Sequence, residues 1–445
     1  MNIFIVLILL YIIISLLALN YPQLIVPILL ILSPLERFNI YVGLTVDPIT
    51  MFIPVIILSL LINYQDIISF AKNINKRLLY SLTAIIIAIF ITDIFSINKF
   101  LSIKATFYIL LSVLILLTTY IYTCKYKNIK QILIFAFISA LIVSTYGIFQ
   151  FFGYLFFHFD TFNLHRYLYS TTINPNAFII QIKNLLILRP NSTFNDVNTS
   201  AGFILLFIPT IILIYFSKIK YKHLKLIKIL SIPILFYFIT TLSKSALIGL
   251  LFTSIFIAIY YYKKFNIKKY LYIVGIMFFI IIIGIIILYP YLYKLQNYSI
   301  NGHLLLVKYS FLSFLDHPLF GIGLGTFSYY FGNYIKPFIP FYYNNIDNPP
   351  LYLLWLSELG IIGFISYIYF IYTYIKIYIK NIGSMLKDNN NIYFIISMGF
   401  LSGVISVLIA NLFHSYFSLF FNWVFLGTFL GITKVLYNTK KIQEK

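Results

Sequence analysis

Long apolar runs separated by short polar stretches form the main pattern along this chain. The runs lie at about 2–32 (broken near Pro22 and Pro27), 44–63, 78–97, 104–124, 130–157, 199–217, 225–241, 243–262, 270–290, 351–376, 392–412 and 414–437. Most are long enough for a helix to cross the apolar core of a bilayer, which takes roughly 20 residues. The pattern therefore predicts an all-α polytopic integral membrane protein with about 12 transmembrane helices.

Two polar interruptions are much longer than the others, and they predict two long external loops. The expected segments are N-terminal helices, an external loop, central helices, a large external loop, C-terminal helices and a cytoplasmic tail, at 1–157, 158–199, 199–290, 291–350, 351–437 and 438–445. Most connections between packed elements are far shorter. We therefore expect these two loops to carry function.

Basic residues gather in alternate loops, and their distribution predicts the orientation. Of the 32 Lys and Arg residues, 21 lie around 72–77, 125–130, 218–228, 263–269, 376–387 and 440–445. By the positive-inside rule these loops and both termini are cytoplasmic. We therefore interpret the net charge of +21 as a topology signal and expect no nucleic-acid partner.

Composition excludes several classes of protein. A chain that is 61% hydrophobic, with a mean hydropathy of +0.96, cannot hide its apolar surface in water. The single cysteine, Cys124, excludes a disulfide framework and a cysteine-based metal site. The first 20 residues lack a basic start and continue into further apolar sequence, so they predict a first span rather than a cleaved signal peptide.

Arginine is rare, yet three of the four arginines fall on the predicted external side. These are Arg37, Arg166 and Arg189. The positive-inside bias disfavours arginine there, whereas its guanidinium group binds phosphate or carboxylate with a bidentate geometry that lysine lacks. Two alternatives follow: the arginines pair with loop carboxylates, or they bind an anionic ligand.

The stretch RPNSTFNDVNTSAGF, which begins at Arg189, leads directly into an apolar run. Asn195, Asp196, Asn198 and Thr199 are candidate N-cap residues for the helix that follows. An outward-facing helix N-terminus beside Arg189 would also attract an anion. The two roles are compatible.

The second long loop contains an apolar stretch at 303–315, interrupted by His303 and Lys308, that predicts an amphipathic helix at the membrane interface. The sequence GIGLGTF follows His317–Pro318. We interpret it as a tight turn and not a nucleotide-binding loop, because no strand precedes it.

The end of this loop predicts a helix start at Pro349 and Pro350. Asp347 and Asn348 would lie at its mouth, and Glu358 would face inward a few turns later. An ionisable side chain inside a span is a candidate functional residue.

The histidines and Lys244 have simpler interpretations. No two of the six histidines have the spacing of a helical zinc motif, so each, His414 included, is interpreted as an interfacial polar residue. In the short turn TTLSKSALIGL, Lys244 is interpreted as a lysine whose ammonium group reaches the interface.

Three stretches together resemble the bacterial O-antigen ligase and O-antigen polymerase superfamily. RPNSTFNDVNTSAGFILLFIP looks like the arginine-led start of a mid-chain span in that family. TLSKSALIGL is similar to its short serine-rich turn, with Lys244 where arginine is usual. DHPLFGIGLGTF and DNPPLYLLWLSELGIIG resemble its glycine-rich block. The resemblance covers roughly residues 185–365.

The resemblance implies a multi-pass glycosyltransferase of the bacterial cytoplasmic (inner) membrane whose site opens on the external face. Such an enzyme moves a glycan from undecaprenyl diphosphate to an acceptor hydroxyl and needs no metal or other cofactor. The expected partners are the undecaprenyl-diphosphate-linked oligosaccharide, the glycan acceptor and membrane lipid. For a polymerase, a chain-length regulator protein is a further expected partner.

Site roles follow from the same resemblance. Arg189 would clamp the pyrophosphate leaving group, and Asp347 and Glu358 are the candidate general bases. The expected substrate-binding residues are Arg166, Asn195, Asp196, Asn198, Lys244, His303, Lys308 and Asn348.

The sequence departs from the family pattern at two positions. The histidine usual before Asn348 is Asp347 here, and the arginine expected ahead of the amphipathic segment is His303. A ligase relies on that histidine, so the departure favours a polymerase of O-antigen or similar repeats, with a ligase acting on lipid A-core as the alternative.

A flippase for lipid-linked oligosaccharides would instead predict paired halves and charges near the midplane. Most spans lack such charges, and the chain has no visible internal repeat. This alternative is therefore disfavoured, and a scaffold role is the remaining one.

Overall fold

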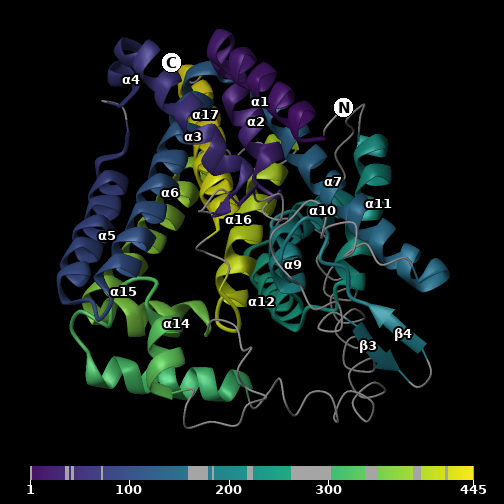
Figure 1. Cartoon of the computed structure of the whole chain (residues 1–445). Coiled ribbons are helices and arrows are strands. Elements are labelled where there is room, and N and C mark those ends of the chain that lie inside the picture. Colours follow the sequence, from purple (N-terminus) through teal and green to yellow (C-terminus); the bar gives the residue numbers. More distant parts are fainter. Residues whose placement is uncertain are drawn as a thin grey trace.

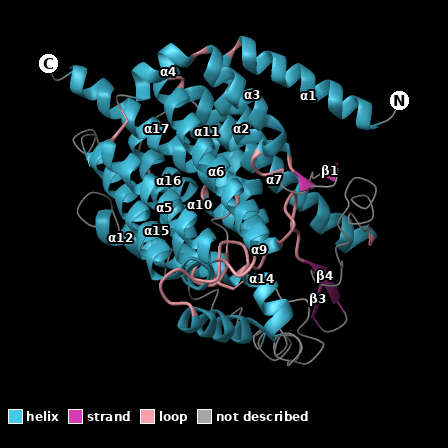
Figure 2. Ribbon diagram, turned by 60° about the vertical axis from the view of Figure 1, so that its left-hand side comes forward, coloured by secondary structure: helices cyan, strands magenta, loops and turns pink. Residues whose placement is uncertain are grey.

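The predicted apolar runs form helices wherever the structure describes them (Figures 1 and 2). A computed structural model describes residues 3–35, 40–41, 45–71, 74–158, 179–182, 185–217, 224–261, 302–335, 349–383, 392–415 and 419–443. The described chain is nearly all helical. This confirms the all-α class.

The elements follow the chain in a simple order. The first helices are α1 (Ile3–Asn20), the 3₁₀ turn η1 (Pro22–Leu24), α2 (Ile25–Leu32), α3 (Pro48–Ile62), α4 (Tyr64–Ala71), α5 (Lys76–Phe95), α6 (Lys99–Tyr126) and α7 (Ile129–Phe157). The later ones are α9 (Val197–Leu205), α10 (Ile208–Phe216), α11 (Leu224–Thr240), α12 (Lys244–Tyr261), α14 (Phe327–Tyr330), the π-helical turn η3 (Phe331–Ile335), α15 (Leu351–Gly383), α16 (Ile392–Ala410) and α17 (Phe420–Gln443). Two small antiparallel pairs join β1 (Ile40–Tyr41) to β2 (Thr45–Val46) and β3 (Ile179–Ile182) to β4 (Leu185–Leu188).

Seven helices in the described part of the chain are long and apolar enough to cross a membrane. One of them combines α9 and α10. The first predicted run, 2–32, is not straight: its two halves are bent by 118° at Pro22, because proline lacks the N–H group that would continue the helix. Counted as one span, this pair would be the eighth. The run at 270–290 lies outside the described residues, so the count of 12 stays a prediction.

Glycine residues allow the central helices to pack closely. α17 packs against α6, and α16 packs against α10 and α12. A Cβ atom on Gly427 would lie 2.3 Å from the carbonyl oxygen of Leu116, and one on Gly403 would lie 2.2 Å from that of Leu206. Small residues at such crossings are typical of membrane helices, whose association depends on close packing.

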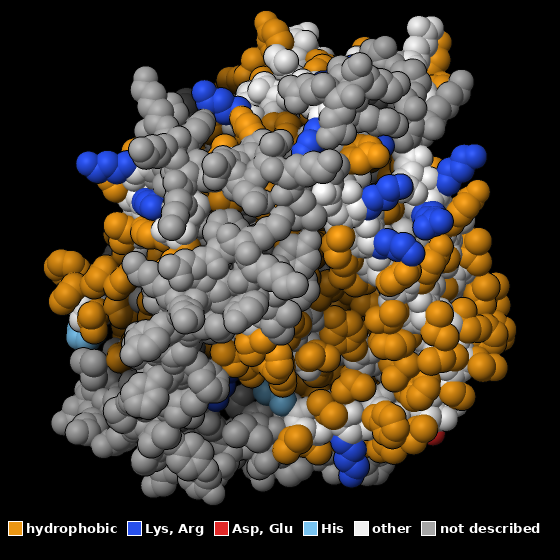
Figure 3. Space-filling view, turned by 180° about the vertical axis from the view of Figure 1, so that it is seen from behind, with side chains coloured by type: hydrophobic (Ala, Val, Ile, Leu, Met, Phe, Trp, Pro, Cys, Tyr) orange, Lys and Arg blue, Asp and Glu red, His pale blue; other side chains and the backbone are white. Residues whose placement is uncertain are grey.

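Charged and apolar side chains are separated on the surface. Seen from behind, most visible lysine and arginine side chains lie along the upper rim, above a broad belt of apolar side chains, while others lie near the lower edge (Figure 3). Lys76 and Arg77 open α5, whose far end reaches the turn that contains Ile322. The basic rim therefore lies at the end of the bundle opposite that turn. The distribution agrees with the predicted alternation, while the orientation in a membrane stays a prediction.

The glycine-rich turn at 317–326 packs backbone to backbone against a break in α15. Gly321 has a φ of 69°, and Gly360, at the break, has a φ of 62°. The Gly323 N–H donates to the carbonyl oxygen of Glu358 at 2.9 Å, and the Ile97 N–H, in the turn that follows α5, donates to that of Ile322 at 3.0 Å. The predicted tight turn is confirmed, and it joins α15 to the α5–α6 connection.

Replacing Gly321 with alanine is expected to destabilise the protein by about 1–3 kcal/mol, because a left-handed backbone strains a residue that has a Cβ. The added carbon would also lie 2.3 Å from the backbone of Glu358. Thermal unfolding in detergent measures the effect. Gly332→Ala is the matched control, since no atom lies within 4 Å of the added carbon there. Equal melting temperatures for the two variants would contradict this account of the turn.

Candidate functional site

The polar patch that follows Arg189 is buried. Asn191, Ser192 and Phe194 have no exposed surface. The side chain of Gln150, on α7, accepts a hydrogen bond from the Ser192 N–H at 2.7 Å and donates one to its carbonyl oxygen at 3.4 Å. Ser192 also donates to the carbonyl oxygen of Val143 at 2.6 Å. These contacts fix the chain immediately after Arg189.

Arg189 lies where the patch meets the starts of two helices. Its Nε donates to the carbonyl oxygen of Thr241 at 2.9 Å, and its Nη2 lies 3.5 Å from Oδ1 of Asn198, in the first turn of α9. The same Oδ1 accepts from the Ser243 hydroxyl at 2.9 Å. Lys244, the first residue of α12, is exposed and close enough for its charge to interact with that of Arg189. Three of the predicted site residues are thus brought together.

Asp196 links this group to a distant histidine. It is the N-cap of α9, one of the four candidates, and its Oδ2 accepts from the Thr199 N–H at 2.9 Å. His414 Nε2 lies 3.3 Å from the same oxygen. Burial raises the pKa of the Asp196 carboxyl. The opposing effects are together larger: they come from the hydrogen bond and charge of His414, the Thr199 N–H and the charge of Arg189. The pKa of Asp196 is therefore below its ordinary value. This partner of His414 could not be predicted, because the two residues are far apart along the chain.

Three helix starts converge around these side chains. Asp196 caps α9, Ser243 precedes α12, and the first N–H of α15, at Leu351, lies 3.2 Å from the carbonyl oxygens of both Asn411 and His414. The positive end of a helix dipole lies at its N-terminus. We call Arg189, Asp196, Asn198, Lys244 and His414 the cationic cluster. Its charges and helix starts make it suited to binding an anion.

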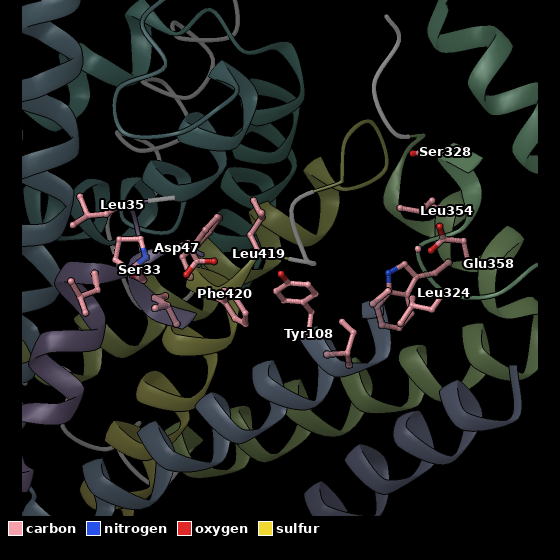
Figure 4. Close-up of a pocket in the computed structure, with 18 residues that line it drawn as sticks. Ser33, Leu35, Asp47, Tyr108, Leu324, Ser328, Leu354, Glu358, Leu419 and Phe420 are labelled. Atoms are coloured by element: carbon pink, nitrogen blue, oxygen red, sulfur yellow. The ribbon is translucent and has the colours of Figure 1, made fainter. Parts of the chain in front are cut away.

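A cavity of about 430 Å³ lies in the same end of the bundle (Figure 4). Asp47 and Glu358 lie at its opposite ends, with Tyr108 and Phe420 between them. Asp47 is the N-cap of α3, and its Oδ1 accepts from the Thr50 N–H at 2.8 Å. Burial raises the pKa of Asp47, and the hydrogen bonds with Thr50 oppose that change.

Glu358 also holds the glycine-rich turn. Its side chain is 4% exposed, and Oε1 accepts from the Phe327 N–H at 3.0 Å. The Gly325 N–H contributes a second hydrogen bond. The carboxylate therefore satisfies backbone groups at the start of α14. Its role as a general base stays a prediction.

The other predicted site residues lie next to the cationic cluster in the sequence, on the amphipathic helix or outside the described residues. Asn195 is half-buried at the end of the patch. The predicted amphipathic helix is confirmed over 302–316, with Leu306 buried and Leu304 exposed, and it crosses the bottom of Figure 1. His303 and Lys308 are exposed on it, and the Lys308 ammonium lies 5.6 Å from the ring centre of Tyr309. The predictions for Arg166, Asp347 and Asn348 fall outside the described residues.

Two substitutions of Asp196 separate its N-cap role from its charge. Alanine removes the cap and is expected to lower the free energy of unfolding by about 1 kcal/mol, whereas asparagine still caps a helix. The folded-state pKa lies below the ordinary 3.8, so the charge contribution is complete above that value. It is lost as the pH falls through the folded-state pKa. Thermal unfolding at several pH values is the measurement. At acid pH, the melting temperature of Asp196→Asn should fall less steeply with decreasing pH than that of the wild type. An equally steep fall would contradict the pairing with His414.

Comparison with known proteins finds one family. Residues 226–368 match the family model described as O-antigen ligase, which is about a third of the chain. The matched region contains α12, the glycine-rich turn and the first half of α15. None of the curated proteins matches the chain. The matched region is therefore similar to O-antigen ligases, and the helical, span-rich fold is consistent with a membrane protein of that kind.

Proposed function

We propose that the protein is a membrane glycosyltransferase that moves a glycan from a lipid diphosphate, undecaprenyl diphosphate, to an acceptor sugar hydroxyl. The carrying observation is the position of Arg189 between the starts of α9 and α12, with the start of α15 joined to this group through His414 and Asp196. The site would open on the external face of the bacterial cytoplasmic membrane, because the basic rim lies at the other end of the bundle.

The cationic cluster would hold the diphosphate of the donor. In the reaction, the acceptor oxygen bonds to the anomeric carbon while the bond from that carbon to the phosphate oxygen breaks. Negative charge develops on the leaving diphosphate, and preorganised cations and helix starts stabilise it. Arg189 suits this task because Thr241 and Asn198 already orient its guanidinium group.

The acceptor hydroxyl must lose a proton, and two groups near the start of α15 can take it. Asp347 comes four residues before Leu351 in the sequence. His414, whose carbonyl oxygen accepts from the Leu351 N–H, is oriented by Asp196. A carboxylate that orients an imidazole is a common arrangement for a general base. Glu358 is a weaker candidate, since its carboxylate accepts backbone hydrogen bonds.

Polymerisation of O-antigen or similar repeats is the favoured activity, and ligation onto lipid A-core is the second candidate. Asp347, in place of the histidine usual in a ligase, favours the polymerase. Deletion of the gene distinguishes them by the glycan profile of the cells. A polymerase deletion leaves single repeats on the final acceptor, which is the expected result. Lipid-linked polymer that accumulates without transfer would indicate a ligase.

Arg189→Lys tests the diphosphate clamp. Lysine keeps the charge but not the bidentate geometry, so we expect glycan transfer to fall about 100-fold. The measurement is chain extension in membranes that contain equal amounts of each variant. Arg77→Lys is the matched control, because Arg77 is exposed at the start of α5 and far from the cluster. Unchanged extension by a normally produced Arg189→Lys protein would rule out the clamp.

A further inference from the structure

The cavity and the cationic cluster differ in charge. Asp47 and Glu358 are the two acids that line the cavity, and the described lining residues include no lysine, arginine or histidine that could bind a diphosphate. An ionised carboxylate in a partly buried site of low dielectric would repel one. The cavity is therefore unsuited to the charged part of the donor.

The aromatic and polar side chains that line the cavity suit a sugar ring. Tyr108, Trp355 and Phe420 present aromatic surface to the cavity. Such surface can cover the apolar C–H face of a sugar ring. Carboxylate oxygens accept hydrogen bonds from sugar hydroxyls, and the Tyr108 phenol can donate or accept. A mostly apolar cavity with a few polar groups, at about 430 Å³, is typical of small-molecule sites.

One wall separates the cavity from the cationic cluster. The Thr193 hydroxyl, in the patch after Arg189, donates to the carbonyl oxygen of Pro34, between the lining residues Ser33 and Leu35. The Phe194 ring lies 5.7 Å from that of Phe421, which also lines the cavity.

α15 makes the same connection from the other side. Its first N–H contacts His414, and Leu354 and Trp355, one turn later, line the cavity. A ligand in the cavity would thus lie next to a ligand at the cluster.

We propose that this cavity is the subsite for an uncharged sugar ring of the acceptor glycan, stacked on Tyr108 and Phe420 with a hydroxyl bound to Asp47. The inference rests on the proposed function and adds the position of the second substrate. Both carboxylates accept a backbone hydrogen bond, and we assign the sugar contact to Asp47 because it lies beside Phe420 (Figure 4). The reacting hydroxyl then attacks the anomeric carbon held at the cluster, its proton passes to the general base, and the bonding electrons leave with the diphosphate.

The two tryptophans of the chain provide a direct binding test. Trp355 lines the cavity and Trp423 does not, so Trp423→Phe leaves one reporter. The protein is placed in lipid nanodiscs without glycoside detergent. Methyl glycosides of common hexoses and N-acetylhexosamines are then titrated while Trp355 emission is followed. We expect saturable changes with at least one glycoside, and no competition by inorganic diphosphate.

Two variants make the test specific. Tyr108→Ala should weaken glycoside binding about tenfold, the effect of losing one aromatic contact. Asp47→Asn, which still caps α3, should also weaken it. Tyr80→Ala is the control, since that tyrosine is 63% exposed on α5 and does not line the cavity. Absence of any glycoside response, competition by diphosphate or polyprenyl phosphate, or unaltered binding by folded Tyr108→Ala and Asp47→Asn proteins would overturn the proposal.

A transfer assay separates this inference from the proposed function. Tyr108→Ala should raise the KM for the acceptor and leave the affinity for labelled undecaprenyl diphosphate unchanged, whereas Arg189→Lys should weaken the latter. If the wild type binds glycosides but transfers no glycan, the proposed function fails and the sugar subsite stands. Transfer by the wild type with an unchanged acceptor KM in Tyr108→Ala would refute the subsite alone.

Discussion

The candidate site depends on the two hydrogen bonds between the Gln150 side chain and the backbone of Ser192. One side chain from α7 satisfies both backbone polar groups of a buried residue that has a positive φ of 54°. In apolar surroundings an unsatisfied backbone group is costly, so irregular chain persists at such depth only when protein groups bind it. The turn at Ser192 leaves Arg189 on one side and the capped start of α9 on the other. Without it, the guanidinium group, Asn198 and Asp196 would not share one location.

Separation of charge organises the rest of this end of the bundle. Cations and helix starts gather between α9, α12 and α15, while carboxylates and aromatic rings line the cavity one wall away. Electrostatic interactions across such short distances are strong where water is scarce. An anionic group and a neutral polyhydroxy group would therefore be sorted into neighbouring positions before any chemistry occurs. When each substrate binds at the position that matches its charge, the two reacting groups are also oriented toward each other.

Local patterns predicted the elements well, and contacts between distant segments could not be predicted. Apolar runs located spans and the 302–316 helix, and cap-forming residue types narrowed the N-cap of α9 to four candidates that include Asp196, because each of these features depends on neighbouring residues. The glycines predicted the glycine-rich turn, but the segment of α15 against which the turn packs could not be predicted. The pairing of His414 with Asp196 and the position of Asp47 in the cavity depend on how helices pack across the bundle. The bend of 118° after α1 also exceeded what Pro22 alone indicates.

The break at Gly360 divides α15 into two pieces. The piece before it carries Leu354, Trp355 and Glu358, and hydrogen bonds tie that piece to the glycine-rich turn. The 302–316 helix joins the same body, because Leu306 packs with Ile322, Phe327 and Leu354. A helix with exposed apolar side chains at the bundle end is thereby coupled to one wall of the cavity. The N–H groups of Ile361 and Ile362, after the break, also donate to carbonyl oxygens of the glycine-rich turn, so this one turn holds both pieces of α15 in place beside the cavity.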